Sequence, residues 1–245
     1  MNKIFRADCI NGMSILKDKS VNLVVTDPPF AIDFKSTKAN YNRKSSNVMK
    51  GYTDIKSKDY EEFTFDWVNQ VNRVLKDNGS MYVFSGYNNL ETILKALRET
   101  GFHLQNHIIW KFQFGVVTKR KFVASHYHLL FVTKHKTKYD FYPNCRFDDE
   151  SRTENNGSAR YRDMEDVWEI KREYWTGEKK TPTKLPSEII RKILSYSSKK
   201  GDLILDPFLG SGQVAVVSKE MKRKYVGFEI VKRYYDFASD RLKSL

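Results

Sequence analysis

Short and long stretches of apolar residues alternate along most of the chain. Short runs rich in β-branched and aromatic residues predict strands, and longer segments with apolar residues three or four positions apart predict helices. The predicted strands cover residues 3–9, 21–26, 80–86, 105–112, 127–133, 202–206 and 224–229. The predicted helices cover residues 11–17, 60–75, 90–98, 185–197 and 213–221, with Asn78-Gly79 expected to end the second. This order predicts an α/β fold with a mostly parallel sheet covered by helices.

Two stretches break the pattern. Residues 33–47 are basic and polar without periodicity, and a loop of that length in a compact domain is typical of a lid or binding loop. We expect residues 31–58 to form a mobile loop that closes over substrate. Between residues 134 and 181, basic residues alternate with acids and with aromatic residues. That pattern suits contact with phosphates and stacking on bases, and it suits a small satellite core with a charged face equally well.

The strand at residues 21–26 ends in a stiff corner. Asp27 follows it, and the rings of Pro28 and Pro29 restrict the backbone, so the Asp27 carboxylate and the Pro28 carbonyl should both project outward. Phe30 adds a flat apolar surface. Two acceptors beside an aromatic ring suit a planar molecule with an amino group. A strand that ends in a proline turn with a capping Asp is the alternative.

A second candidate site follows the strand at residues 202–206. The chain runs from Asp206 through a turn with Gly210 and Gly212 into a helix, and the next strand ends at Glu229. Glycines let a ligand approach the backbone, and the carboxylate can accept hydrogen bonds from both ribose hydroxyls. An adenosine-containing cofactor fits this geometry. The dinucleotide fingerprint also matches, which leaves a nicotinamide-dependent oxidoreductase as a competitor, although too few elements follow the turn to complete a dinucleotide domain.

Charge and composition limit which partners, location and kinds of site we expect for this chain. The formal net charge of +13 indicates an anionic partner, with nucleic acid ahead of a membrane surface. Without a long apolar run or a signal peptide, we expect a cytoplasmic protein with no membrane contact. Cys9 and Cys145 are the only cysteines, too few for a disulfide framework or a cysteine-based zinc site. His126 and His128 share one side of a predicted strand, but no third ligand is apparent nearby, so we expect no metal site.

The two sites and their order resemble the S-adenosylmethionine-dependent DNA amino-methyltransferases of the β class. That family has an Asp/Ser-Pro-Pro-Tyr/Phe motif, then a target-recognition region, then a Phe-x-Gly-x-Gly motif. The matching parts here are Asp27-Pro28-Pro29-Phe30, residues 134–181 and Phe208-Leu209-Gly210-Ser211-Gly212. The resemblance implies a Rossmann-like methyltransferase sheet with one antiparallel strand and a circularly permuted motif order. Residues 1–133 and 182–245 would form one catalytic domain, with residues 134–181 as the target-recognition insertion.

The resemblance also implies which residues hold S-adenosylmethionine. Its methionine part would contact Asp206, Phe208, Gly210, Ser211 and Gly212. Glu229 would bind the ribose and Asp8 the adenine. Thr183 and Lys184 lie in a segment similar to the one that meets the cofactor's carboxylate, although the wording here departs from the family's usual His-Pro-Thr-Gln-Lys-Pro.

The implied activity is methyl transfer to the N6 amino group of an adenine flipped out of double-stranded DNA, as in restriction-modification systems. Asp27 and the Pro28 carbonyl would accept the two N–H bonds of the amino group, and Phe30 would stack on the base. Adenine is favoured over cytosine because the family more often uses Asp for adenine and Ser for cytosine. Several relatives form dimers, so a homodimer is an option.

Other functions remain as alternatives. N4-cytosine methylation is the first, followed by RNA methylation, whose enzymes commonly put the glycine motif first. A non-catalytic nucleic-acid-binding module would keep the basic aromatic region without needing either ligand site. C5-cytosine methylation is disfavoured because neither cysteine follows a proline as that class requires, and a zinc deaminase is disfavoured because its ligand motifs are absent.

Overall fold

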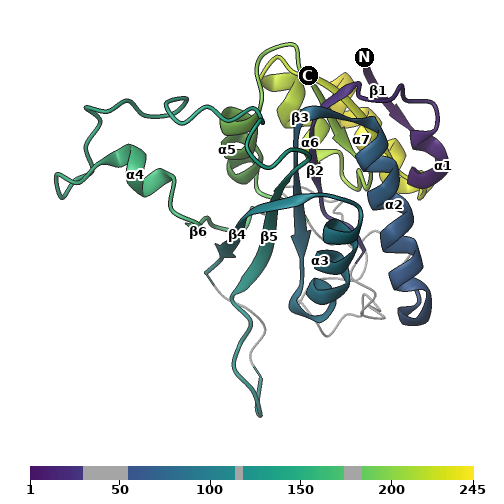
Figure 1. Cartoon of the computed structure of the whole chain (residues 1–245), viewed down its shortest axis with the longest axis horizontal. Helices are drawn as coiled ribbons and strands as arrows, with labels where there is room; N and C mark the ends of the chain where they lie inside the picture. Colours follow the sequence, from purple (N-terminus) through teal and green to yellow (C-terminus); the bar gives the residue numbers. More distant parts are fainter. Residues whose placement is uncertain (30–54, 114–117, 174–183) are drawn as a thin grey trace.

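A single mixed β-sheet forms the centre of the molecule (Figure 1). The computed structural model describes residues 1–29, 55–113, 118–173 and 184–245. Within these residues the strand order is β1-β8-β7-β2-β3-β5-β4-β6. The strands are β1 (Asn2–Phe5), β2 (Val21–Thr26), β3 (Leu75–Ser85), β4 (His103–Lys111), β5 (His126–Thr133), β6 (Val167–Glu169), β7 (Leu203–Asp206) and β8 (Lys224–Phe228). Among the described strands only β5 runs antiparallel to its neighbours, which confirms the predicted sheet.

Helices cover both faces of this sheet. The described helices are α1 (Cys9–Met13), α2 (Tyr60–Val74), α3 (Leu90–Glu99), α4 (Ala159–Asp163), α5 (Ser187–Ser197), α6 (Gln213–Glu220) and α7 (Lys232–Lys243), with short 3₁₀ turns η3 (Ser57–Asp59) and η4 (Tyr87–Asn89). Helices α1 to α3 pack on one face and α5 to α7 on the other. The described helices include none that combines the length and the apolar character needed to cross a membrane.

The buried strand β2 explains this layered arrangement. Val21 and Val24 face the core under α1 to α3, whereas Leu23 and Val25 face the core under α5 and α6. All four side chains have no solvent exposure. A strand covered on both faces needs a continuous apolar run, which is the pattern of residues 23–25.

The prediction that Asn78-Gly79 ends the second helix is wrong. Helix α2 ends at Val74, because Leu75 turns extended and pairs directly with Val21 at the start of β3. The next pair in the β2–β3 ladder is Leu23 with Ser80, so residues 76–79 form a bulge in β3. A Cβ atom at Gly79 would lie 2.6 Å from the Leu75 side chain. The glycine therefore makes room for Leu75 within a strand rather than stopping a helix.

Helix α7 and strand β6 have no counterpart in the predicted elements. In α7, Tyr234, Ala238 and Leu242 are buried at four-residue intervals between charged residues. Strand β6 is only three residues long and belongs to the segment whose hydrophobic periodicity is weak. Strand β1 and helix α1 are also shorter than the predicted ranges 3–9 and 11–17.

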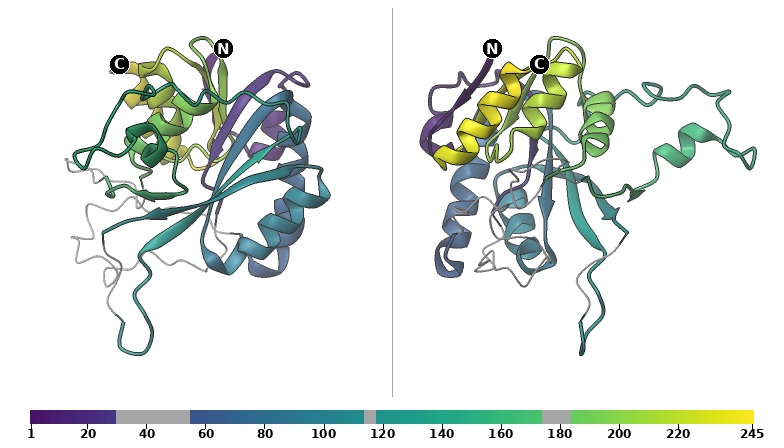
Figure 2. Two further views of the ribbon diagram at one scale, coloured as in Figure 1. Left: turned by 60° about the vertical axis from the view of Figure 1, so that its left-hand side comes forward. Right: turned by 180° about the vertical axis from the view of Figure 1, so that it is seen from behind.

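Two segments project from the sheet at its β4 side (Figures 1 and 2). The segment that carries α4 extends sideways, and the hairpin between β4 and β5 extends beyond the ends of those strands. The described part of the predicted substrate loop at 31–58 is limited to residues 55–58, so this prediction lies largely outside the described residues.

Candidate functional site

Four adjacent parallel strands each lead to an acidic residue at the same edge of the sheet. Asp8 follows β1, Asp27 follows β2, Asp206 ends β7 and Glu229 follows β8. Since these strands are neighbours in the order β1-β8-β7-β2, their carboxyl ends meet. Ligands of open α/β sheets bind at this edge.

Asp206 lies at the centre of this group. Its side chain is 4% exposed. Oδ1 accepts hydrogen bonds from the Thr26 hydroxyl at 3.2 Å and from the Phe208 backbone N–H at 3.1 Å. Burial, together with the charges of Asp27 and Glu229, raises the pKa of Asp206 to about 8. Asp206 thus keeps its proton at neutral pH.

Asp27 stands at the predicted corner. Pro28 behind it is buried, and Asp27 and Pro29 are half-buried. Burial raises the pKa of Asp27 to about 7. The structure thus places the Asp27 carboxyl one strand away from Asp206, as the parallel pairing of β2 with β7 requires. Phe30, the predicted stacking ring, lies outside the described residues.

The glycine turn follows β7 directly. Gly210 and Gly212 have φ values of +50° and +77°, which L side chains rarely adopt. A Cβ atom at Gly212 would also lie 2.8 Å from the Ala238 Cβ on α7. Both the backbone conformation and the close approach of α7 therefore require glycine at residue 212.

Glu229 holds this turn in place. One carboxylate oxygen accepts the Gly210 N–H at 2.9 Å and the other accepts the Val231 N–H at 2.7 Å. Glu229 is 8% exposed, and burial raises its pKa to about 7. The turn after β7 and the end of β8 therefore form one unit.

Phe208 extends from the turn to the opposite helical layer. Its ring packs edge-on against Trp67 with centroids 5.5 Å apart, and it contacts Phe63 at 5.8 Å. Trp67 is fully buried. The aromatic residue of the glycine motif is thus anchored by helix α2.

Arg241 is a residue of this site that sequence reasoning missed. Its guanidinium donates to the Ser211 carbonyl at 2.6 Å and to Gln213 Oε1 at 2.5 Å. Gln213 in turn donates to the Ser187 hydroxyl at 2.6 Å, which links α6 to the start of α5. An arginine about 30 residues beyond the turn carries no local signal for this contact.

Asp8 and Lys184 have structural partners. Asp8 caps helix α1 by accepting the Asn11 N–H at 3.0 Å. Lys184 forms an ion pair with Glu173, whose other oxygen accepts the Ser187 N–H at 2.6 Å. Both predicted cofactor contacts stay predictions, and Thr183 lies outside the part of the chain that the structure describes.

The predicted histidine pair has a third member. His107 Nε2 lies 2.7 Å from His128 Nδ1, and the His126 ring lies 5.2 Å from the His128 ring. Burial lowers the pKa of His128, and the neighbouring His107 and His126 lower it further. In the described ranges, however, no three potential ligand side chains are arranged to hold a metal ion.

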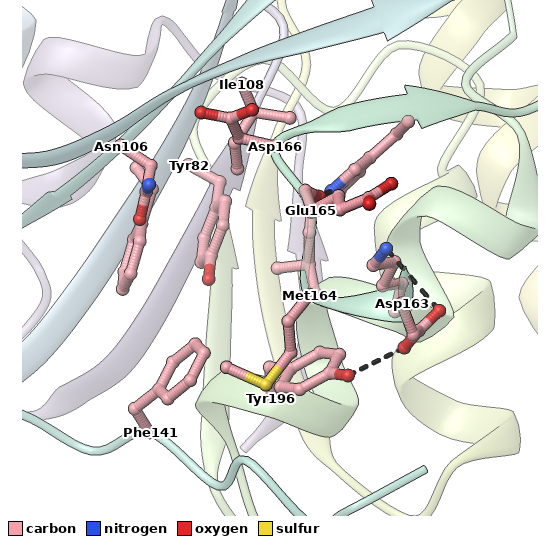
Figure 3. Close-up of a pocket in the computed structure, with 13 residues that line it drawn as sticks. Tyr82, Asn106, Ile108, Phe141, Asp163, Met164, Glu165, Asp166 and Tyr196 are labelled. Carbon is pink, nitrogen blue, oxygen red and sulfur yellow. Dashed lines mark hydrogen bonds and ion pairs between the residues drawn. The ribbon is translucent and has the colours of Figure 1, made fainter. Parts of the chain in front are cut away.

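Much of the aromatic content of residues 134–173 packs against the catalytic sheet. Tyr139, Phe141 and Trp168 join the core cluster of α5. Figure 3 shows the junction, where Phe141, Asp163 and Tyr196 line an open pocket next to α5. Asp163 at the end of α4 accepts the Tyr196 hydroxyl at 2.7 Å and pairs with Arg146 at 2.9 Å. The satellite-core interpretation thus explains the inner side of this segment.

The outer side of the same segment is exposed and carries charges of both signs, since acids such as Asp149, Glu154 and Glu165 are exposed among its basic residues. Tyr161 is 73% exposed, and Arg152 and Arg162 are exposed as well. These side chains are available for contact with an anionic partner.

Comparisons with a family model, with sequence relatives and with solved structures agree with one another. The family model described as DNA methylase matches residues 21–240. The chain is 31% identical to Type II methyltransferase M2.LlaDCHI of Lactococcus lactis subsp. cremoris, over 98% of this chain and 88% of the relative. The fold matches the crystal structure of the M1.HpyAVI-SAM complex with a TM-score of 0.69 at 23% identity, over 99% of both chains. It also matches the cytosine-N4-specific PvuII DNA methyltransferase with a TM-score of 0.72 at 18% identity, over 98% of this chain and 86% of the other.

Proposed function

The chain belongs to the DNA methylase family, and we propose that it transfers the methyl group of S-adenosylmethionine to the N6 amino group of adenine at a specific site in double-stranded DNA. The observation that carries this proposal is the pair of carboxyl groups of half-buried Asp27 and buried Asp206, joined through Thr26 at the ends of two neighbouring strands. Asp27 would bind the amino group of the base, and Asp206 would bind the cofactor.

The residues at this edge fit S-adenosylmethionine, which supplies an electrophilic methyl group on a positively charged sulfur. Three carboxyl groups with raised pKa values, those of Asp27, Asp206 and Glu229, suit a ligand with two cationic groups. Asp206, Phe208, Ser211 and the two glycines would hold its methionine part, and Glu229 would accept hydrogen bonds from the ribose hydroxyls. We assign Asp8, which follows β1, to the adenine of the cofactor.

Asp27 and the Pro28 carbonyl would act on the amino group of the base. The lone pair of an exocyclic amino group is delocalised into the ring, which makes the nitrogen a poor nucleophile. When two acceptors hold its N–H bonds, the nitrogen can become pyramidal and direct its lone pair at the methyl group. Catalysis then rests on positioning and preorganised acceptors without a covalent enzyme intermediate.

Access to the amino group requires base flipping. The extrusion of one base costs a few kcal/mol, which contacts between cations and phosphates must offset. The net charge of +13 and the exposed Arg152, Tyr161 and Arg162 support that role, and we assign target recognition to residues 134–181. A DNA substrate also favours the cytoplasm as the location. The homodimer stays a prediction that sedimentation analysis of the protein tests.

The test is methyl transfer to mixed-sequence duplex DNA from cofactor with a labelled methyl group. We expect N6-methyladenine after digestion to nucleosides. N4-methylcytosine alone would replace the adenine assignment, and transfer to RNA with none to DNA would overturn the proposal. Sequencing of the modified DNA identifies the recognition site.

Asp27→Ala separates catalysis from binding. We expect this variant to bind S-adenosylmethionine normally in calorimetry and to show almost no methyl transfer. An unchanged rate would contradict the role of Asp27, and binding of a nicotinamide dinucleotide in place of S-adenosylmethionine would favour the oxidoreductase alternative.

A further inference from the structure

The hairpin between β4 and β5 carries an unusual tip. Phe122 is 101% exposed, and the adjoining Val123 is 40% exposed. Three consecutive exposed cations, Lys119, Arg120 and Lys121, precede them. A large aromatic side chain entirely in water, next to a cluster of positive charge, calls for a partner that is both anionic and able to stack.

Nearby acids do not neutralise this charge. Residues 112–128 contain neither Asp nor Glu. Within the described part of the chain, none of the three cations at the tip has an ion-pair partner. The tip therefore presents its full charge to solvent.

The base of the hairpin, in contrast, is firmly packed. The Phe112 N–H donates to the Ser125 carbonyl at 2.9 Å, which closes the two arms. The Phe112 ring is buried, contacts Tyr127 at 5.4 Å between centroids, and lies 3.8 Å below the Arg172 guanidinium carbon. Residues 118–125 thus leave the sheet from a packed base, which sets the direction in which they start.

That direction is toward the proposed active-site edge. Strand β4 runs parallel to β2 and β3, so Lys111 ends at the same edge as Asp27, and Figure 2 shows the hairpin continuing outward from there. Three strand spacings separate β2 from β4, which is about 14 Å. The hairpin can therefore contact the same stretch of duplex as Asp27.

We propose that Phe122 is a wedge that inserts into the DNA base stack beside the flipped base, while Lys119, Arg120 and Lys121 contact the flanking phosphates. Apolar side chains inserted between base steps are a known means of distorting a duplex, and aromatic rings replace lost stacking without regard to sequence. This assignment rests on the proposed function, since it needs a DNA substrate with an extruded base. A protein partner would not need an uninterrupted run of cations at the edge that holds the active site.

The test compares single-turnover methyl transfer on two duplexes that carry the recognition site. One is fully paired, and in the other the target base faces a mismatch, which makes extrusion easier. For Phe122→Ala we expect a rate at least tenfold lower on the paired duplex and within about threefold of wild type on the mismatched duplex. Phe122→Trp should match wild type on both.

Ile15→Ala is the matched control. Ile15 is 59% exposed and precedes β2, so it lies at the opposite edge of the sheet. We expect wild-type rates on both duplexes. If Phe122→Ala is as fast as wild type, or loses the same factor on both duplexes, the wedge is overturned while the proposed function stands. If wild-type protein transfers no methyl group to either duplex, the proposed function itself fails.

The salt dependence of DNA affinity tests the three cations at the tip separately. Replacement of Lys119, Arg120 and Lys121 together by Ala should reduce the slope of log affinity against log salt concentration by about 2 to 3, since each phosphate contact contributes roughly 0.9. An unchanged slope would contradict the phosphate contacts.

Discussion

The Thr26 hydroxyl donates a hydrogen bond to Asp206 Oδ1 across 3.2 Å, although the two residues are 180 positions apart in the sequence. Thr26 is the last residue of β2 and directly precedes Asp27, whereas Asp206 is the last residue of β7. The same Oδ1 atom accepts the Phe208 N–H. One carboxyl oxygen thus connects the corner that would hold the base to the turn that would hold the cofactor.

Thr26→Val should weaken this connection. The variant keeps the shape of a fully buried side chain but leaves Asp206 with one donor fewer. We expect a loss of about 1 kcal/mol in the free energy of unfolding and weaker binding of S-adenosylmethionine, measured by denaturant unfolding and calorimetry. Thr64→Val, which removes a buried hydroxyl that bonds to the Tyr60 carbonyl within α2, is the control. It should lose similar stability with unchanged cofactor affinity, and equal affinity losses would contradict the connection.

Asp206→Asn should stabilise the unliganded protein at alkaline pH. Asp206 keeps its proton in the folded chain up to about pH 8, whereas an ordinary Asp loses it near pH 4. Between these values the folded state binds the extra proton, so the wild-type protein loses stability as pH rises. The amide cannot ionise. At pH 8 we therefore expect the Asn variant to melt several degrees higher, since one kcal/mol corresponds to about 2–4 °C for a chain of this size.

Two comparisons check that result. At pH 4 the melting temperatures of wild type and Asp206→Asn should converge. Asp77 has a pKa below its usual range because Lys19 donates a hydrogen bond to it, so Asp77→Asn should give no gain at pH 8. A difference between Asp206→Asn and wild type that is independent of pH would show that burial does not hold the proton on Asp206.

Arg241→Gln should make the turn at Gly210 and Gly212 less rigid, because it removes the hydrogen bonds of the guanidinium to Ser211 and Gln213. The guanidinium bonds to Ser211 and Gln213 do not touch the ligand side, so Arg241 acts as a positioning residue. We expect S-adenosylmethionine affinity to fall about tenfold, which corresponds to 1.4 kcal/mol, with a smaller change in the methyl-transfer rate at saturating cofactor. Arg223→Gln removes hydrogen bonds to the Leu194 and Ser198 carbonyls away from the turn. This control should lose stability but keep its cofactor affinity.

Gly212→Ala tests close packing against backbone strain. At φ +77° a Cβ atom is strained, and here it would also meet the Ala238 Cβ at 2.8 Å. We expect a loss of about 2–3 kcal/mol in the free energy of unfolding and no detectable cofactor binding. Gly201→Ala has a similar φ of +89° with open space around the new Cβ. It should show the strain alone, about 1 kcal/mol, and full cofactor affinity. Equal losses in the two variants would contradict the packing argument.

The acids of the site were predictable from the sequence because each follows a short apolar run. Asp27 follows a predicted strand, Asp206 and Glu229 lie at the ends of two others, and in a parallel sheet strand ends share an edge. The structure adds the order of the strands, and with it the approach of Thr26 to Asp206. That contact depends on the pairing of β2 with β7, which no local pattern encodes.

Other features were misread or missed for physical reasons. Gly79 looked like a helix stop, but its role is to leave space for the Leu75 side chain. His107 lies on β4 and meets His128 only because β4 pairs with β5, and Arg241 reaches the glycine turn from a helix whose apolar positions are sparse. Each of these contacts is a product of tertiary packing. Phe122 was also missed, since an exposed aromatic residue in a loop looks the same in sequence as a buried one.

Strand β1 has a consequence for how the protein is made. Its only neighbour among the described strands is β8, and the Tyr225 N–H bonds to the Asn2 side chain 223 residues earlier in the sequence. At ribosomal speeds of about 5–20 residues per second, β1 waits roughly 10 to 45 seconds for its partner to be synthesised. Until then the growing chain exposes an unpaired strand and has no Glu229 to hold the glycine turn. The protein should therefore be unable to bind its cofactor until β8 has been synthesised and has paired with β1.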